Sequence, residues 1–356
     1  MGKDSHTKLD PSVPSAEVCC LLRLPDELLL WVAQSLGGRA RQQALCALTL
    51  VNRRLALIVR DLVYCSPVVK PRNAYQLAAR LLNDATLAKR VVCLEILNGD
   101  AEDERFSNWE WGDHDFHGGD AEEPSEYTLD LAFQCRRVLH YHGINDDSWR
   151  WAAGLQAGDY YAYIALLLII TPNLQQLILS NQYAKALAQP ENAYRGRIGT
   201  PARPYLANGL GSMSQSLREL IILPMLHDRP KYLASDPWNL ISINMMGLMS
   251  VTHLTIPSTC LCKGVFGAPD ASPFPPNLQR FLITGCTDEI VSFLQWFLMH
   301  KRHKFLLLRE LEACWNETDI DQLSEKLRCH AELKLFRVCR AVEHEGAIVR
   351  WTFEGN

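Results

Sequence analysis

The sequence predicts a mixed α/β chain in which a short N-terminal module of three helices precedes an irregular array of strand–loop–helix units. Two observations predict this class. Up to Leu62, apolar residues recur every three or four positions, which is the period of amphipathic helices. Beyond that point, short stretches with alternating apolar residues recur at unequal intervals, which is typical of the strands of a degenerate repeat.

The composition is that of a folded chain with little charge bias. Of the 356 residues, 48% are hydrophobic and 21% are charged, which is enough to bury a core. The 36 basic and 40 acidic residues give a formal net charge of −4, so charge offers no argument for nucleic acid or an anionic membrane as a partner. The longest apolar stretch, residues 162–170, is much shorter than the roughly 20 residues of a transmembrane helix.

The cysteines and the N-terminal residues bear on the compartment. The 12 cysteines include no C-x-x-C pair, and residues 1–17 lack the apolar core of a signal peptide. We therefore expect a cytoplasmic and/or nuclear chain with reduced, mostly buried thiols. Residues 1–19 are expected to form a flexible N-terminus.

The first predicted helix has an apolar stripe at every fourth position. Its members are Leu24, Leu28, Val32 and Leu36. Pro25 suits the first turn, and the charges of Asp26 and Glu27 favour a helix N-terminus. Gly37-Gly38 is expected to end this helix with a left-handed cap.

Two further short helices are expected before residue 66. The second holds Ala44, Leu45, Ala47 and Leu48, and the third places Val51, Leu55, Ile58 and Leu62 on one face. Asn52, Arg53 and Arg54 are expected to face outward. Leu29, Leu30 and Trp31 lie off the main stripe, and three short helices cannot bury all of this apolar surface, which favours a partner-docking module.

This module resembles the F-box. The resemblance rests on Leu24-Pro25-Asp26-Glu27-Leu28-Leu29, the apolar stripe, and Val51-Asn52-Arg53-Arg54-Leu55, where Leu55 stands in place of the usual aromatic residue. It implies that residues 20–66 form an F-box helical module that docks a Skp-type adaptor and, through it, a cullin–RING ligase. The adaptor-binding residues that it implies are Leu24, Pro25, Leu28, Leu29, Val32, Leu36, Leu48, Val51 and Leu55.

Two later stretches resemble the corresponding parts of fungal F-box proteins. Residues 81–91 are similar to the segment that leads from a helix into a first strand, here expected at residues 91–96. Residues 159–179 are similar to the helix-to-strand entry into leucine-rich repeats. Residues 67–99 are accordingly expected to be a linker helix and first strand.

The repeat pattern is also visible without the resemblance. Loose copies of L-x-x-L-x-L-x-x-N/C begin at Val91, Leu174, Leu217, Val251, Leu278, Leu308 and Leu333. The copy at Leu278 is the best and places Cys286 at the Asn/Cys position, which Asn316 occupies in the copy at Leu308. Helices are expected between strands, one after Thr287 and one after Thr318. A single unit cannot bury its apolar face, so stacked neighbours must supply the core.

Residues 100–126 differ from the rest of the chain in charge, because 11 are acidic and one is basic. We expect a solvated acidic loop, in preference to a metal or partner motif at Asp113-His114-Asp115-Phe116-His117, since these histidines lack a fixed scaffold. Residues 127–356 are then the degenerate leucine-rich-repeat-like substrate-binding domain.

No pattern predicts catalysis or a cofactor. Cys260-x-Cys262 and His300-x-x-His303 together could supply four zinc ligands, but the one-residue cysteine spacing favours structural thiols. We expect no catalytic residue, no cofactor and no metal.

The expected fold is therefore α/β (mixed), an N-terminal three-helix F-box followed by an irregular leucine-rich-repeat-like solenoid. The expected function is that of a substrate-recognition adaptor of an SCF-type E3 ubiquitin ligase, with an unknown protein substrate as its second partner. The candidate substrate-binding residues, chosen by strand position, are Gln175, Arg218, Thr252, Gln279 and Arg309. A non-catalytic leucine-rich-repeat scaffold without a ligase link is the alternative, and an enzyme with a dispersed site is the third.

Overall fold

The computed structural model divides the chain into two compact units, Met1–Val63 and Tyr64–Asn356. The described residues are 23–36, 41–97, 126–142, 151, 154–155, 160–180, 209, 211–213, 215–223, 245, 248–258, 261, 274–286, 290, 293–294, 296–297, 305–316, 337–340 and 346–352. Helices and parallel strands are both present, which confirms the predicted α/β class.

The first unit contains three helices, as the apolar periodicity predicted. They are α1 (Asp26–Ser35), α2 (Arg41–Val51) and α3 (Arg53–Cys65), of which α3 continues for two residues into the second unit. Ala33, Leu45 and Val59, one from each helix, form a small buried cluster. Partly buried residues of the first unit around this cluster are Leu36, Leu48, Ile58, Leu62 and Val63.

The ends of these helices differ slightly from the expected ones. Pro25 precedes α1 instead of opening it, and α1 gives way to extended backbone at Leu36 (ψ 125°), before the expected Gly37-Gly38 cap, which lies outside the described residues. Val51 is the last residue of α2 instead of the first of the third helix. The cause is Asn52, whose Oδ1 accepts a hydrogen bond from the Leu55 backbone N–H at 2.8 Å and so begins α3.

The second unit begins with a small helical layer. Its elements are β1 (Val68–Val69), the short 3₁₀ helix η2 (Pro71–Asn73), α4 (Ala74–Asn83), α5 (Ala85–Arg90) and β2 (Cys93–Ile96). Asp84 separates α4 from α5 because its side chain accepts hydrogen bonds from the Thr86 and Leu87 backbone N–H groups. The strand expected at residues 91–96 is present as β2, but it is the second strand of the chain and not the first, since β1 precedes it.

Two longer helices follow along the chain. α9 (Tyr160–Ile170) packs against α4, and its residues 162–170, the longest apolar stretch of the sequence, are all buried. Gly209 lies so close to α9 that an added Cβ would stand 3.0 Å from the Ala165 carbonyl oxygen. α7 (Glu126–Tyr141), which the sequence did not predict, buries Cys135 and Leu139. Among the helices that the structure describes, none is long and apolar enough to cross a membrane.

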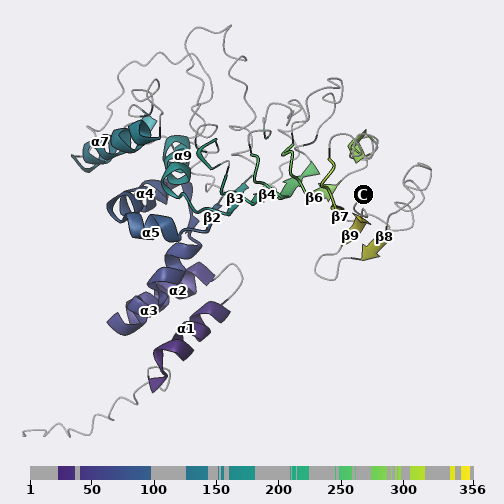
Figure 1. Ribbon diagram of the computed structural model, residues 1–356. Coiled ribbons are helices and arrows are strands. Elements are labelled where there is room, and N and C mark those ends of the chain that lie inside the picture. Colours follow the sequence, from purple (N-terminus) through teal and green to yellow (C-terminus); the bar gives the residue numbers. More distant parts are fainter. Residues whose placement is uncertain are drawn as a thin grey trace, which may run out of the picture. The chain divides into compact units, whose positions relative to one another are not determined.

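Seven parallel strands follow one another in chain order across the sheet (Figure 1). After β1 and β2 these are β3 (Gln176–Ser180), β4 (Glu219–Leu223), β5 (His253–Pro257), β6 (Arg280–Cys286) and β7 (Glu310–Asn316). From β2 to β7, each strand begins two residues after the first apolar residue of its predicted repeat. Each strand pairs with the next in direct register, and a shift between Ile283 and Cys286 coincides with Gly285 at φ 61°.

The repeat predicted at Leu333 does not extend the parallel sheet. Its strand, β8 (Arg337–Arg340), pairs antiparallel with β9 (Gly346–Thr352), and β9 pairs antiparallel with β7. Only residues 341–345 join β8 to β9. A parallel crossover needs a dozen or more residues, so this short connection produces an antiparallel pair. Because β9 is the strand that pairs with β7, β8 lies at the edge.

One face of the sheet lies in the core. Leu94, Leu177, Leu220, Leu254, Phe281 and Leu311 form a buried row across β2–β7 and belong to the same cluster as the buried residues of α4, α7 and α9. Five aromatic side chains pack together in the C-terminal part of this core: Phe274, Phe281, Phe293, Phe297 and Phe305. Phe293 and Phe297 come from the segment where a helix was expected after Thr287. The acidic segment up to residue 125 and the helix expected after Thr318 lie outside the described residues.

Candidate functional site

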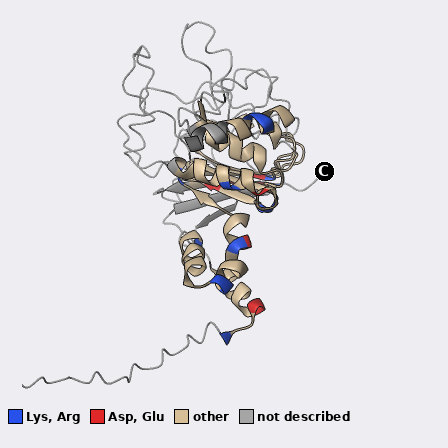
Figure 2. Cartoon of the chain, turned by 90° about the vertical axis from the view of Figure 1, so that its left-hand side faces the viewer, with Lys and Arg blue, Asp and Glu red and all other residues tan. Residues whose placement is uncertain are grey.

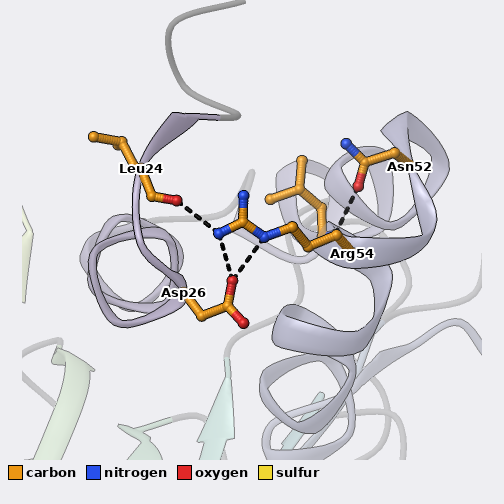
Figure 3. A network of polar contacts seen from close by, with 5 residues as sticks. Leu24, Asp26, Asn52 and Arg54 are labelled. Carbon is orange, nitrogen blue, oxygen red and sulfur yellow. Dashed lines mark hydrogen bonds and ion pairs between the residues drawn. The ribbon is translucent and has the colours of Figure 1, made fainter.

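Arg54 joins the start of α3 to the start of α1. Its Nη2 lies 2.6 Å from Asp26 Oδ1, its Nε donates to the same oxygen at 2.7 Å, and Nη2 also donates to the Leu24 carbonyl at 2.7 Å. Figure 3 shows this network beside the Asn52 cap of α3. Arg54 is exposed, as expected, but it also holds the Leu24-Pro25-Asp26 segment against α3.

The helix α1 has an inner and an outer apolar face. Leu29 and Ala33, one turn apart, are buried. The outer residues are Leu28, Trp31 and Val32, which are 45%, 74% and 41% exposed. Beyond Asp26 and Glu27, α1 has no charged residue, and Figure 2 shows the rest of it in tan. An uncharged, apolar outer face on a surface helix is typical of a docking surface.

The nine residues expected to contact an adaptor fall into three groups. Pro25, Leu28, Val32 and Val51 are exposed, whereas Leu24, Leu36 and Leu48 are half-buried. Leu29 and Leu55 are each only 2% exposed. Contrary to expectation, these two leucines face the interior of the module, because they lie one turn from the core residues Ala33 and Val59. Their support of a docking surface is therefore indirect.

The five residues expected to bind substrate form one row along the sheet. Gln175, Arg218, Thr252, Gln279 and Arg309 each stand immediately before a strand, from β3 to β7. From Arg218 onward, each backbone N–H donates to the carbonyl of the preceding member of the row, at 2.7 to 2.9 Å, and the Gln175 N–H donates to the Val92 carbonyl. We call this row the N-terminal rim. Its members lie one position before the strands, not within them as expected, and the row holds two arginines and no acidic residue.

The strand residues that alternate with the buried row form an open face. Its first row is Cys93, Gln176, Glu219, His253, Arg280 and Glu310, and its second row is Glu95, Ile178, Ile221, Thr255, Leu282 and Glu312. Apart from the buried Glu312, these residues are exposed or half-buried. The sequence analysis did not select them. The sequence signal that could have found them is the alternation of strand side chains between two faces. Residues on either side of the buried second apolar residue of each repeat point to the open face.

Polar contacts link neighbouring strands across the open face. The Gln176 amide donates to Glu219 Oε2 at 2.7 Å. Arg280 lies 3.3 Å from both the Glu310 and the Glu312 carboxylates. Because Arg280 and Glu310 are each 44% exposed, their ion pair contributes little to stability.

Side-chain amides also connect the turns before two strands to the preceding unit, at the end of α5 in one case and at a turn in the other. Asn173 Nδ2 donates to the Lys89 carbonyl at 2.7 Å, and Asn277 Nδ2 donates to the Met249 carbonyl at 2.6 Å. Both asparagines follow a proline and occupy the third position of a four-residue turn. The sequence analysis considered only the Asn/Cys position of the repeat, at Cys286 and Asn316, and did not select these two asparagines.

Fewer thiols are buried than the sequence analysis expected: among the cysteines whose side chains the structure describes, Cys135 and Cys286 are buried, Cys65, Cys93 and Cys314 are half-buried, and Cys46 is exposed. Cys286 is buried, and its Sγ donates to the Ile283 carbonyl at 3.6 Å. Burial raises the pKa of Cys286 well above its ordinary value, and it raises the pKa of Cys135 to about 12. High thiol pKa values make these two cysteines poor nucleophiles at neutral pH.

The described residues give no support for metal chemistry. Within them, no group of three or more His, Cys, Asp or Glu side chains is arranged to hold a metal ion. The four ligands of the alternative zinc site, Cys260, Cys262, His300 and His303, lie outside the described residues.

Comparison of the chain with protein-family models, with curated proteins and with solved structures finds no match.

Proposed function

We propose that the chain is a substrate-recognition adaptor of an SCF-type ubiquitin ligase. In this proposal the first unit is an F-box that docks a Skp-type adaptor, and the second unit is a leucine-rich-repeat-like solenoid that holds a target protein. The observation that carries the proposal is the outer face of α1, where Leu28, Trp31 and Val32 are exposed within the stretch that resembles the F-box.

The arrangement of the first unit supports a docking role. Its core is small, since each helix contributes one residue to the central buried cluster. Among the residues of this unit that the structure describes, six large apolar side chains nevertheless remain exposed: Leu28, Trp31, Val32, Leu50, Val51 and Leu57. Burial of apolar area contributes about 25 cal/mol per Å², so a partner that covered the three on α1, Leu28, Trp31 and Val32, would gain binding energy.

The second unit supports the recognition role. Its sheet extends the same register from strand to strand, so one long surface carries polar and aliphatic residues in rows. In the proposed complex, tethering increases the effective concentration of a target lysine near the conjugating enzyme. The chain itself supplies no reacting group in this proposal.

Co-purification tests the proposal directly. The full chain is expressed with a recombinant Skp-type adaptor and a cullin, and retention is measured for the wild type and for Leu28→Ala combined with Trp31→Ala. Retention by the wild type and loss by the double variant support the proposal. A folded wild type that retains no adaptor contradicts it and favours the scaffold alternative.

A further inference from the structure

We propose that the open face binds a target segment that combines lysine or arginine with aliphatic side chains. The inference rests on the proposed function for its target, but its chemistry rests on the open face alone.

The centre of the open face is aliphatic except for one threonine, Thr255. Ile178, Ile221, Thr255 and Leu282 occupy the second row on four neighbouring strands, in the register Ile178↔Ile221↔Thr255↔Leu282. Strands lie about 4.8 Å apart, so this stripe is about 14 Å long, the reach of about four extended residues. All four side chains are half-buried, so they remain partly accessible for contact with aliphatic side chains of a ligand.

Acidic residues lie at both ends of the stripe and beside it. The second row ends in Glu95 on one side and Glu312 on the other, and the first row adds Glu219 and Glu310. Across β2–β7, the two rows thus contain four carboxylates and one guanidinium, that of Arg280. Such an excess attracts basic segments and repels acidic ones.

Glu219 is the carboxylate with the strongest claim to contact a ligand cation. Glu219 is half-buried and lies beside the stripe, because it stands two residues before Ile221 on the same strand, β4. Its hydrogen bond comes from the neutral Gln176 amide, which leaves the negative charge in place. Arg280, by contrast, already contacts two carboxylates.

The N-terminal rim provides an internal comparison. It runs beside the first row of the open face, yet it contains Arg218 and Arg309 and no acidic residue. The two surfaces therefore favour ligands of opposite charge. A ligand that binds the open face should bind more tightly when it is basic, whereas a ligand that binds the rim should bind more tightly when it is acidic.

The test uses the full chain and three labelled twelve-residue peptides of alternating sequence: lysine–leucine, serine–leucine and glutamate–leucine. Fluorescence anisotropy measures affinity at low salt. We expect the lysine peptide to bind about tenfold more tightly than the serine peptide, and the glutamate peptide to bind most weakly.

Substitutions then locate the binding surface. Glu219→Gln should weaken the lysine peptide several-fold without affecting the serine peptide, and Glu219→Asp should restore most of the binding. Glu27→Gln, an equal charge change in the first unit, should leave lysine-peptide affinity unchanged. Ile221→Ser should weaken both the lysine and the serine peptide.

Two results overturn the inference: equal affinity for the lysine and glutamate peptides, or equal effects of Glu219→Gln and Glu27→Gln. The adaptor experiment is scored separately on the same preparations. Lysine-peptide binding that depends on Glu219, in a chain that retains no adaptor, contradicts the proposed function and leaves this inference standing. A chain that retains the adaptor but binds the three peptides with equal affinity contradicts this inference and leaves the proposed function standing.

Discussion

The Arg54 guanidinium holds the first turn of α1 through Asp26, with Arg54 Nη2 2.6 Å from Asp26 Oδ1. The same nitrogen donates to the Leu24 carbonyl, so the two contacts fix both the side chain and the backbone of the segment that precedes the outer face of α1. A sequence motif that includes Leu24, Pro25 and Asp26 is thus stabilised by a residue about thirty positions later in the chain.

The first prediction concerns this contact. Arg54→Met should speed hydrogen exchange of the α1 amides by no more than about fivefold, or about 1 kcal/mol, because the two side chains are 42% and 63% exposed to water. The effect should decrease at high salt. Arg53→Met, an equal substitution at the neighbouring exposed position, is the control and should leave exchange unchanged. Equal effects of the two variants would show that Arg54 does not hold α1.

The second prediction separates the outer face of α1 from its core. Leu28→Ala and Trp31→Ala should each weaken binding of a Skp-type adaptor by about 2 kcal/mol, or about thirtyfold, without changing helix content. Leu57→Ala, at another exposed leucine of the module, should have a much smaller effect. Leu29→Ala should instead destabilise the module, since Leu29 is buried. Calorimetric titration and circular dichroism measure the two effects. Unchanged adaptor retention by a Leu24→Ala, Leu28→Ala double variant would refute the docking role.

The sequence predicted the sheet well because its signal is local and repeated. Leu174, Leu217, Val251, Leu278 and Leu308 each precede a strand by two residues, and the second apolar residue of each repeat points into the core. Unequal spacing did not hide the strands, because strand position depends on the leucine pattern and not on the loops between.

The two rows of the open face were harder to predict from the sequence. In L-x-x-L, the first x, such as Gln175, completes the turn, and only the second, such as Gln176, begins the strand. Gln175 and its equivalents therefore form the N-terminal rim, one position ahead of the open face. The antiparallel order of β9 and β8 was also not predictable from the repeats, because it depends on pairing with β7. The Arg54 contacts connect two helices, and no local pattern encodes them.

The third prediction concerns the connection between turns. Asn277→Ala removes the donor to the Met249 carbonyl and should lower the local free energy of opening around β5 and β6 by about 1 kcal/mol. Asn277→Asp should cost at least as much, because a carboxylate cannot donate to that carbonyl. Ser216→Ala is the control, since Ser216 bonds within its own turn, to the Met213 carbonyl. Hydrogen exchange of residues 248–258 measures the change, and equal protection in Asn277→Ala and the wild type would contradict it.

The fourth prediction is an order of thiol reactivity. Cys46 is exposed, whereas Cys135 and Cys286 are buried and have raised pKa values. Because the thiolate is the nucleophile, iodoacetamide at pH 8 should label Cys46 well before the other two in the native protein. Labelling followed by peptide mapping measures the order. Early labelling of Cys286 would show that the end of β6 does not bury this residue, and the register drawn for the best repeat would then be wrong.

The last prediction follows from the same burial and concerns stability at high pH. Burial raises the pKa of Cys135 from 9.0 to about 12, so above pH 9 the thiol ionises in the unfolded chain but stays neutral in the folded one. The unfolded state then binds fewer protons, and the stabilisation that is fully present below pH 9 is lost as the pH rises towards 12. At pH 10 the loss from this one thiol is about 1.4 kcal/mol. Cys135→Ala should therefore show a smaller fall in unfolding free energy between pH 7.5 and pH 10 than the wild type, measured by urea denaturation. Cys46→Ala, at an exposed cysteine, is the control, and its unfolding free energy should decrease as much as that of the wild type. If the unfolding free energy of Cys135→Ala also decreased by the same amount, this thiol would already be accessible to water in the folded chain.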